Sequence, residues 1–271
     1  MSMATPTTDH ELEEQIAAEL RAAEESASPI EPFAARLGED DVERAYRVQH
    51  LNTAFALSAG RTLRGRKIGL TAEAVQQQLG VDEPDYGALF ADMRIPDGGS
   101  VDAAMLISPR IEAELALVVG TGISEPDLPL DELAACVSYA VPALEIVDSR
   151  LRDWRIGIVD TIADNGASAR FVLGENHHAV DGLDLSSCGM ELFRNGELVS
   201  SGQASATMGG PLQALRWLVD TLVRHDLPLG PGDVVLTGAL GPVIAMAPGD
   251  RFQAHFDPLS SVSLNVEEPR S

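Results

Sequence analysis

Lysine is almost absent from this chain: of the 19 basic side chains among its 271 residues, only Lys67 is a lysine. An arginine-biased chain retains a lysine where a compact ammonium is needed, one whose pKa can be shifted toward neutrality. Gly65 and Gly69 bracket this lysine in Gly-Arg-Lys-Ile-Gly, which predicts a short strand that backbone or ligand can approach closely. The alternative is a single lysine left over by compositional drift, but a solvated lysine belongs more naturally on a polar helix face. Lys67 is therefore a candidate functional residue.

Long apolar runs and cysteine frameworks are missing as well. No segment approaches the roughly 18 apolar residues that a membrane span needs, and the N-terminus has neither the basic nor the apolar part of a signal peptide. Cys136 and Cys188 both lie in apolar contexts, so we expect two buried thiols rather than a disulfide. These features predict a cytoplasmic protein with no membrane partner.

Positive charge is scarce, and the formal net charge is −23. Without a basic stripe to offset phosphate repulsion, nucleic acids and anionic membranes are excluded as partners. A small anionic substrate remains compatible with this charge. It would need a metal ion or a few focused cations to overcome the field of the whole protein.

Turn residues and apolar periodicity predict a helical segment over residues 1–62 and a strand-rich remainder over 63–271. The remainder shows strands that are not separated by regular helices, so we expect an α+β fold with antiparallel or mixed sheets. Asn195-Gly196 between two apolar pairs predicts a β-hairpin. Helices are expected over 9–25, from Asp40 or Asp41 to about Ser58, over 72–79 and over 211–225. An irregular stretch is expected over 81–90, and a helix that leads into a strand over 134–147. Strands are expected around Lys67 and over 110–119, 234–237, 251–256 and 261–266.

Two acidic residues share one face of the expected strand 110–119. Residues i and i+2 of a strand project to the same side, about 6.5–7 Å apart, so the carboxylates of Glu112 and Glu114 lie side by side. Such carboxylates repel each other unless one is protonated or a cation lies between them. The alternative, an exposed edge strand whose glutamates face water, fits this fragment equally well.

Glu145 supports the interpretation that a cation binds between these carboxylates. It stands in Val-Pro-Ala-Leu-Glu-Ile-Val, where burial of an unpaired carboxylate would be costly. Three carboxylates without thiol or imidazole suit a hard divalent ion such as Mg²⁺ or Mn²⁺. Zinc is disfavoured because the histidines lack ligand spacing, and the adjacent His177 and His178 receive no role.

Several motifs, in order over about residues 40–271, resemble those of a known family. The motifs are Lys-Ile-Gly-Leu-Thr (67–71), Pro-Asp-Tyr-Gly (84–87), Pro-Arg-Ile-Glu-Ala-Glu-Leu-Ala (109–116), Pro-Ala-Leu-Glu-Ile-Val-Asp-Ser-Arg (142–150), Ala-Asp-Asn-Gly-Ala-Ser (163–168), Leu-Thr-Gly-Ala-Leu-Gly-Pro (236–242), Pro-Gly-Asp-Arg-Phe (248–252) and Ser-Ser-Val-Ser (260–263). With these motifs the chain resembles the 2-hydroxypenta-2,4-dienoate hydratase and 4-oxalocrotonate decarboxylase group of the fumarylacetoacetate hydrolase superfamily.

The resemblance implies a β-rich roll of mixed sheets with peripheral helices and an N-terminal helical segment, with residues 63–271 as the catalytic domain, assembled into a homo-oligomer. One departure is Gly166, which stands where alanine is expected in the hydratases. The implied site consists of Glu112, Glu114 and Glu145 as ligands of Mg²⁺ or Mn²⁺, Lys67 and Asp85 as catalytic residues, and Ser168 and Leu70 as substrate-binding residues.

The implied reaction is the addition of water to 2-hydroxypenta-2,4-dienoate to give 4-hydroxy-2-oxopentanoate, a lyase step in the catabolism of aromatic compounds. Decarboxylation of 4-oxalocrotonate on the same scaffold stays open as an alternative. A C–C hydrolase of the acylpyruvate type would need a water-activating base, often a histidine on an N-terminal segment, and no candidate is evident. A further alternative is a non-catalytic partner subunit, because decarboxylase and hydratase of this group can associate; association with a pathway decarboxylase or aldolase is therefore also expected.

Overall fold

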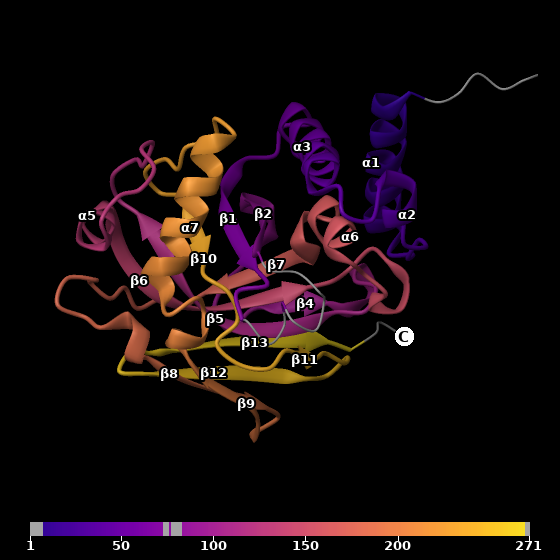
Figure 1. The fold of residues 1–271 in the computed structure, drawn as a ribbon. Coiled ribbons are helices and arrows are strands. Elements are labelled where there is room, and N and C mark those ends of the chain that lie inside the picture. The colour runs from indigo at the N-terminus through magenta and orange to yellow at the C-terminus, as the bar shows by residue number, and fades with distance from the viewer. Residues whose placement is uncertain (1–7, 73–75, 77–82, 269–271) are drawn as a thin grey trace, which may run out of the picture.

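The computed structural model describes residues 8–72, 76 and 83–268, which form two stacked sheets with helices along one side (Figure 1). The larger sheet has eight strands in the order β2-β1-β10-β5-β6-β7-β3, with β11 paired to β5. The smaller sheet has five strands in the order β4-β13-β12-β8-β9. Both sheets contain a parallel pair among antiparallel neighbours, which confirms the expected α+β fold with mixed sheets.

The N-terminal helices form where the sequence predicts them. Helix α1 (Asp9–Ser26) begins at a capping box in which Thr8 and Glu11 satisfy each other's backbone amides, and α3 (Val42–Ser58) is capped by the Asp41 side chain. Gln49 ties α3 to the rest of the molecule, since its buried amide donates to the carbonyl oxygens of Tyr86 (2.7 Å) and Ile162 (2.9 Å). The division of the chain at residue 62 stays a prediction.

The larger sheet is built around two long central strands, β5 (Arg110–Val119) and β6 (Val137–Val147). It is strongly curled, because β1 and β10 rise steeply from the plane of β5 and β7 (Figure 1). One face of the sheet packs against α3, α6 and α7. The other strands of the larger sheet are β1 (Leu63–Gly69), β2 (Asp85–Phe90), β3 (Arg94–Ile95), β7 (Ser168–Leu173), β10 (Val234–Leu236) and β11 (Ile244–Ala245). The helices not yet given are α2 (Ala34–Leu37), α5 (Leu130–Cys136), α6 (Ile158–Ala163) and α7 (Pro211–Arg224).

The smaller sheet is half-buried and alternates accordingly. Strands β12 (Arg251–Asp257) and β13 (Ser261–Glu267) bury every second residue against the large sheet. Strands β8 (Gly189–Arg194) and β9 (Glu197–Gln203) join through Asn195 and Gly196, both at positive φ (55° and 87°), which confirms the predicted tight hairpin. Strand β4 (Ser100–Asp102) lies parallel to β13 at the other edge.

The inner face of the curled sheet carries a second, separate apolar core. Part of this core alternates along the two strands that carry the three glutamates. Glu112 and Glu114 continue the row of Ala116 and Val118 on β5, and Glu145 continues the row of Val141 and Ala143 on β6. The other members are Ala56, Ala88, Leu89, Phe90, Met93, Phe171, Leu173, Val234 and Leu236. The acidic residues therefore form one end of an otherwise apolar interior.

One prediction about secondary structure is wrong. The stretch 81–90 is not irregular throughout, because Asp85–Phe90 forms the fully buried strand β2, paired antiparallel to β1. Pro84-Asp85-Tyr86-Gly87 has turn composition, and the pairing that makes it a strand is long-range and cannot be read locally. The helix expected over 72–79 falls mostly outside the described residues. None of the described helices is long and apolar enough to cross a membrane.

Candidate metal centre and active site

Three carboxylates converge where β5 and β6 pair. Glu112 and Glu145 are directly opposed in the antiparallel register, and Glu114 follows two residues on, so all three project to one face. One oxygen from each lies within 4.8 Å of the others. The fragment is not a water-facing edge strand, since β5 is central in the sheet and Glu114 and Glu145 are fully buried.

Most oxygens of this cluster lack a hydrogen-bond donor. The Gly238 amide donates to Glu114 Oε2 at 2.8 Å, whereas Glu114 Oε1 and both oxygens of Glu145 have no hydrogen bond to any described residue. Burial raises the pKa of all three carboxyl groups, and that of Glu145 reaches about 7. Buried oxygens without donors are costly. Their number, chemistry and spacing fit a hard divalent cation.

Lys67 lies beside this cluster on β1. Its side chain is 3% exposed, and Nζ lies 3.5 Å from Glu145 Oε2. Burial alone would lower the lysine pKa, but the charges of Glu145 and Asp85, and of the other two glutamates, outweigh it and raise the pKa above its usual range. The lone lysine is thus held as an ammonium among four acids.

Asp85 occupies the start of β2, opposite Gly69 of β1 in the antiparallel register. A methyl group at Gly69 would overlap the Asp85 carboxylate, so the close approach requires glycine there. Both Asp85 oxygens are buried without a hydrogen bond to a described residue, and burial raises its pKa although the Lys67 charge opposes the rise. The two predicted catalytic side chains therefore lie together.

A left-handed turn supports Lys67 from the opposite side. Asn165, Gly166 and Ala167 all have positive φ (57°, 61° and 56°), and the Asn165 side chain replaces a strand partner for Ala88, accepting from its amide at 2.6 Å and donating to its carbonyl at 3.0 Å. A methyl group on Gly166 would lie 3.1 Å from Lys67 Cδ. Backbone conformation and this contact both favour glycine over the alanine expected at this position.

The two residues expected to touch substrate lie near the same site. Ser168 begins β7 and is 4% exposed, and its hydroxyl has no hydrogen-bond partner among the described residues. Leu70 follows Gly69 at positive φ (56°), with its carbonyl accepting from Gln76 Nε2 at 2.7 Å. The hydroxyl follows the turn that supports Lys67 and lies close enough to Glu145 to oppose the rise of its pKa, so it lies at the acidic cluster, where a ligand can accept a hydrogen bond from it.

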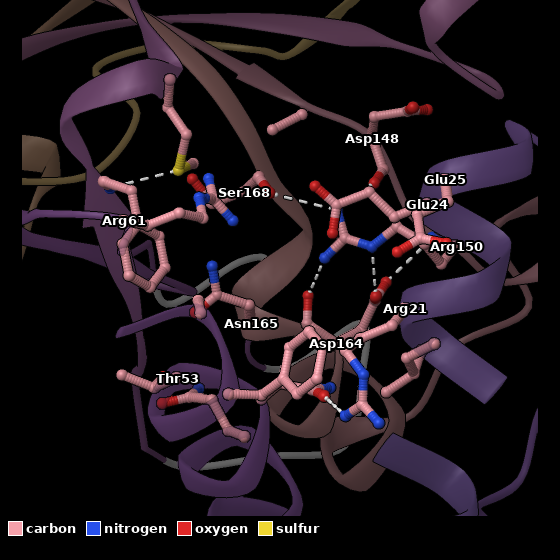
Figure 2. Close-up of a pocket in the computed structure, with 18 of the residues that line it drawn as sticks. Arg21, Glu24, Glu25, Thr53, Arg61, Asp148, Arg150, Asp164, Asn165 and Ser168 are labelled. Carbon is pink, nitrogen blue, oxygen red and sulfur yellow. Dashed lines mark hydrogen bonds and ion pairs between the residues drawn. The ribbon is translucent and has the colours of Figure 1, made fainter. Parts of the chain in front are cut away.

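Sequence reasoning missed the network that holds this turn. The Arg150 guanidinium donates to the Asp164 carboxylate (2.5 Å) and to the carbonyls of Asp148 (2.9 Å) and Ser168 (3.1 Å), and Ser149 Oγ donates to Asp164 at 3.0 Å. Burial raises the pKa of Asp164 to about 6, although the Arg150 charge opposes it. The network borders a cavity of about 430 Å³ that is lined by neither Lys67 nor the acidic triad (Figure 2). No short-range signal joins residues that are 14 positions apart.

Comparisons with known proteins identify the family and the fold. Residues 68–267 match the family described as fumarylacetoacetate (FAA) hydrolase C-terminal. The chain is 49% identical over 250 residues to 2-keto-4-pentenoate hydratase 1 of Dechloromonas aromatica, covering 92% of this chain and 95% of that protein. It is 45% identical over 254 residues to 2-keto-4-pentenoate hydratase of Paraburkholderia xenovorans, covering 94% of each. The structure of 4-oxalocrotonate decarboxylase from Pseudomonas putida G7, complexed with magnesium and adipate, superposes with a TM-score of 0.91 at 30% identity, covering 98% of this chain and all of that one.

Proposed function

This chain belongs to the fumarylacetoacetate hydrolase family, and from that premise we propose that it is a metal-dependent hydro-lyase. It adds water to 2-hydroxypenta-2,4-dienoate, the enol form of 2-keto-4-pentenoate, to give 4-hydroxy-2-oxopentanoate. The single observation that carries the proposal is the convergence of three carboxylates, two of them fully buried, beside the only lysine of the chain. Support for the substrate comes from relatives named 2-keto-4-pentenoate hydratase, which are 45–49% identical over more than nine-tenths of this chain.

Glu112, Glu114 and Glu145 would hold the ion, which we propose is Mg²⁺ or Mn²⁺. The undonated oxygens of Glu114 and Glu145 are the sites that a cation would satisfy. When bound, the ion supplies Lewis acidity toward the carboxylate and the C2 oxygen of a 2-hydroxy-dienoate. The ion would also offset the repulsion between an anionic substrate and a protein whose formal net charge is −23.

Lys67 and Asp85 would carry the protons of the reaction. The dienol loses its hydroxyl proton and gains one on C5; water then gives its oxygen to C4 while C3 is protonated. Lys67 and Asp85 lie on paired strands beside the cluster, with Asp85 unpaired by any hydrogen bond to a described residue. General acid–base groups in such positions are worth about 10²–10⁴ in rate. The Ser168 hydroxyl and Leu70 would contact the substrate.

Decarboxylation of 4-oxalocrotonate is the second candidate. The superposition on 4-oxalocrotonate decarboxylase, with a TM-score of 0.91, favours it. The same cluster would serve both reactions, since each passes through an enolate of a 2-oxo acid. The higher sequence identity to the named hydratases, 45–49% against 30%, makes hydration the primary proposal.

A substrate comparison tests the assignment. Purified protein with Mg²⁺ or Mn²⁺ receives 2-hydroxypenta-2,4-dienoate or 4-oxalocrotonate, and loss of dienol absorbance and CO₂ release are followed. We expect loss of dienol absorbance with the first substrate and little CO₂ from the second. CO₂ release without hydration would replace the proposal by the decarboxylase. Neither turnover nor Mn²⁺ binding would favour a non-catalytic partner subunit.

The resemblance implies assembly, and the composition and N-terminus of the chain predict its location. A homo-oligomer, association with a pathway decarboxylase or aldolase, a cytoplasmic location and a catalytic domain over residues 63–271 remain predictions. Light scattering on the purified chain, alone and mixed with a candidate partner, measures the first two.

A further inference from the structure

The acidic cluster meets solvent at Glu112. Glu114, Glu145 and Asp85 are 0% exposed and Lys67 is 3% exposed, whereas Glu112 is only partly buried. Among the described acids of the cluster, Glu112 is therefore the one nearest to solvent. We take its side of the cluster as the approach for a small molecule and consider the neighbouring residue on the same face of β5.

Arg110 is the flanking residue, two positions before Glu112 on the same face of β5. Its guanidinium makes no hydrogen bond and no ion pair with any described residue. Arg150 and Arg152, by contrast, are paired with carboxylates. The charge of Glu112 acts on Arg110 and opposes the lowering of its pKa by burial, but no hydrogen bond to a described residue occupies the guanidinium donors, which are therefore open to an incoming anion.

The guanidinium is held in place by an aromatic platform. Its central carbon lies 4.1 Å from the ring centroid of Trp154. Asp153 and Trp154 both have positive φ (58° and 54°), a conformation that residues other than glycine rarely adopt, and the indole donates to the Ser108 carbonyl at 2.9 Å. The Ser108 amide in turn donates to Asp148 Oδ1 at 2.6 Å. Strained backbone and two hydrogen bonds thus fix the ring under Arg110.

We propose that Arg110, stacked on Trp154, captures the carboxylate of the substrate at the mouth of the acidic cluster. A planar guanidinium pairs with a carboxylate through two parallel hydrogen bonds, and stacking leaves its edges free for them. The inference rests on the proposed function in so far as that function supplies an anionic 2-oxo or 2-hydroxy acid. It makes Arg110 a specificity residue for carboxylates rather than a proton-transfer residue.

Kinetics of Arg110→Gln test this role. We expect KM for 2-hydroxypenta-2,4-dienoate to rise about tenfold, kcat to stay within about twofold, and the fall of kcat/KM with added salt to become shallower, because a charge-assisted contact is lost. Arg251→Gln is the matched control, since Arg251 is an exposed arginine on β12 of the other sheet. An unchanged KM, or a loss confined to kcat, overturns the inference.

Calorimetry separates this inference from the proposed reaction. Oxalate, an unreactive dicarboxylate, is titrated into protein loaded with Mn²⁺, and the expected result is about tenfold weaker binding by Arg110→Gln with Mn²⁺ affinity retained. If the wild type binds oxalate in this way but does not hydrate the dienoate, the proposed function fails while the capture role stands for another carboxylate. Equal oxalate binding by wild type and Arg110→Gln, or no oxalate binding by the loaded wild type, overturns the capture role.

Discussion

Replacing Glu145 by glutamine should stabilise the metal-free protein at neutral pH and lower its affinity for Mn²⁺. Glu145 is fully buried, neither of its oxygens accepts a hydrogen bond from a described residue, and its Oε2 lies 3.5 Å from the Lys67 ammonium. Glutamine has the same shape without the charge. The substitution therefore removes a repulsive member of the cluster, while Asp85, Glu112 and Glu114 still neutralise Lys67.

The pKa of Glu145 sets the size and the pH window of this effect. Burial, followed by the charge of Glu112, raises that pKa from 4.5 to about 7, although Lys67 opposes the rise. The folded protein holds this proton more tightly than the unfolded chain. The contribution of Glu145 to the free energy of unfolding is therefore fully present below about pH 4.5 and is lost as the pH rises to about 7. The difference corresponds to about 3 kcal/mol of unfolding free energy lost by the wild type across that window.

Urea unfolding in the presence of a chelator measures the effect. Between pH 5 and pH 8 the wild type should lose more unfolding free energy than Glu145→Gln, by up to about 3 kcal/mol. Saturating Mn²⁺ should reverse the order, because a bound ion stabilises the folded protein by an amount that grows with the logarithm of the ratio of ion concentration to Kd, and the variant, which lacks one ligand, has the larger Kd. Glu197→Gln, an exposed carboxylate on β9, is the control and should follow the wild type in both conditions.

Two results would refute this reasoning. Parallel pH profiles for wild type and Glu145→Gln would mean that the carboxylate is solvated or fully paired in solution. An equal gain in stability on adding Mn²⁺ would mean that Glu145 does not bind the ion.

Three further substitutions probe the surroundings of the cluster. Lys67→Ala should lower turnover by about 10²–10⁴ while Mn²⁺ titration shows an intact metal site; near-native turnover would remove Lys67 from the reaction. Asn165→Ala deletes both hydrogen bonds to Ala88 and loosens the turn against Lys67, so kcat should fall by about tenfold, and equal losses of kcat and Mn²⁺ affinity would contradict a positioning role. Gly69→Ala places a methyl group on the Asp85 carboxylate and should cost about 1–3 kcal/mol in urea unfolding, where a wild-type midpoint would show that the close approach is absent.

The acidic triad was predictable because strand periodicity is local. Glu112 and Glu114 stand at i and i+2 in a recognisable strand, and Glu145 lies in an apolar run where a free carboxylate is costly. The opposed register of Glu112 and Glu145 is a consequence of β5–β6 pairing, which periodicity does not specify. The sequence therefore indicated which residues form the triad, whereas the pairing of β5 with β6 brings their carboxylates together.

Other parts of the site depend on contacts between distant segments. Asp85 was expected in the site only through the resemblance, because its own segment reads as a turn and becomes strand β2 through pairing with β1. The Asn165 side chain substitutes for a strand partner, and the Arg150–Asp164 network joins two loops. The ring of Trp154 beneath Arg110 likewise belongs to another element. No local propensity encodes these pairings.

Anomalous scattering from crystals soaked in Mn²⁺ would locate the bound ion experimentally. We expect one strong peak per chain between the carboxylates of Glu112, Glu114 and Glu145, at coordination distances of about 2.0–2.6 Å. The peak should disappear in Glu114→Gln. A peak at any other cluster of acids, or a persistent peak in that variant, would contradict the assignment of this site as the metal centre.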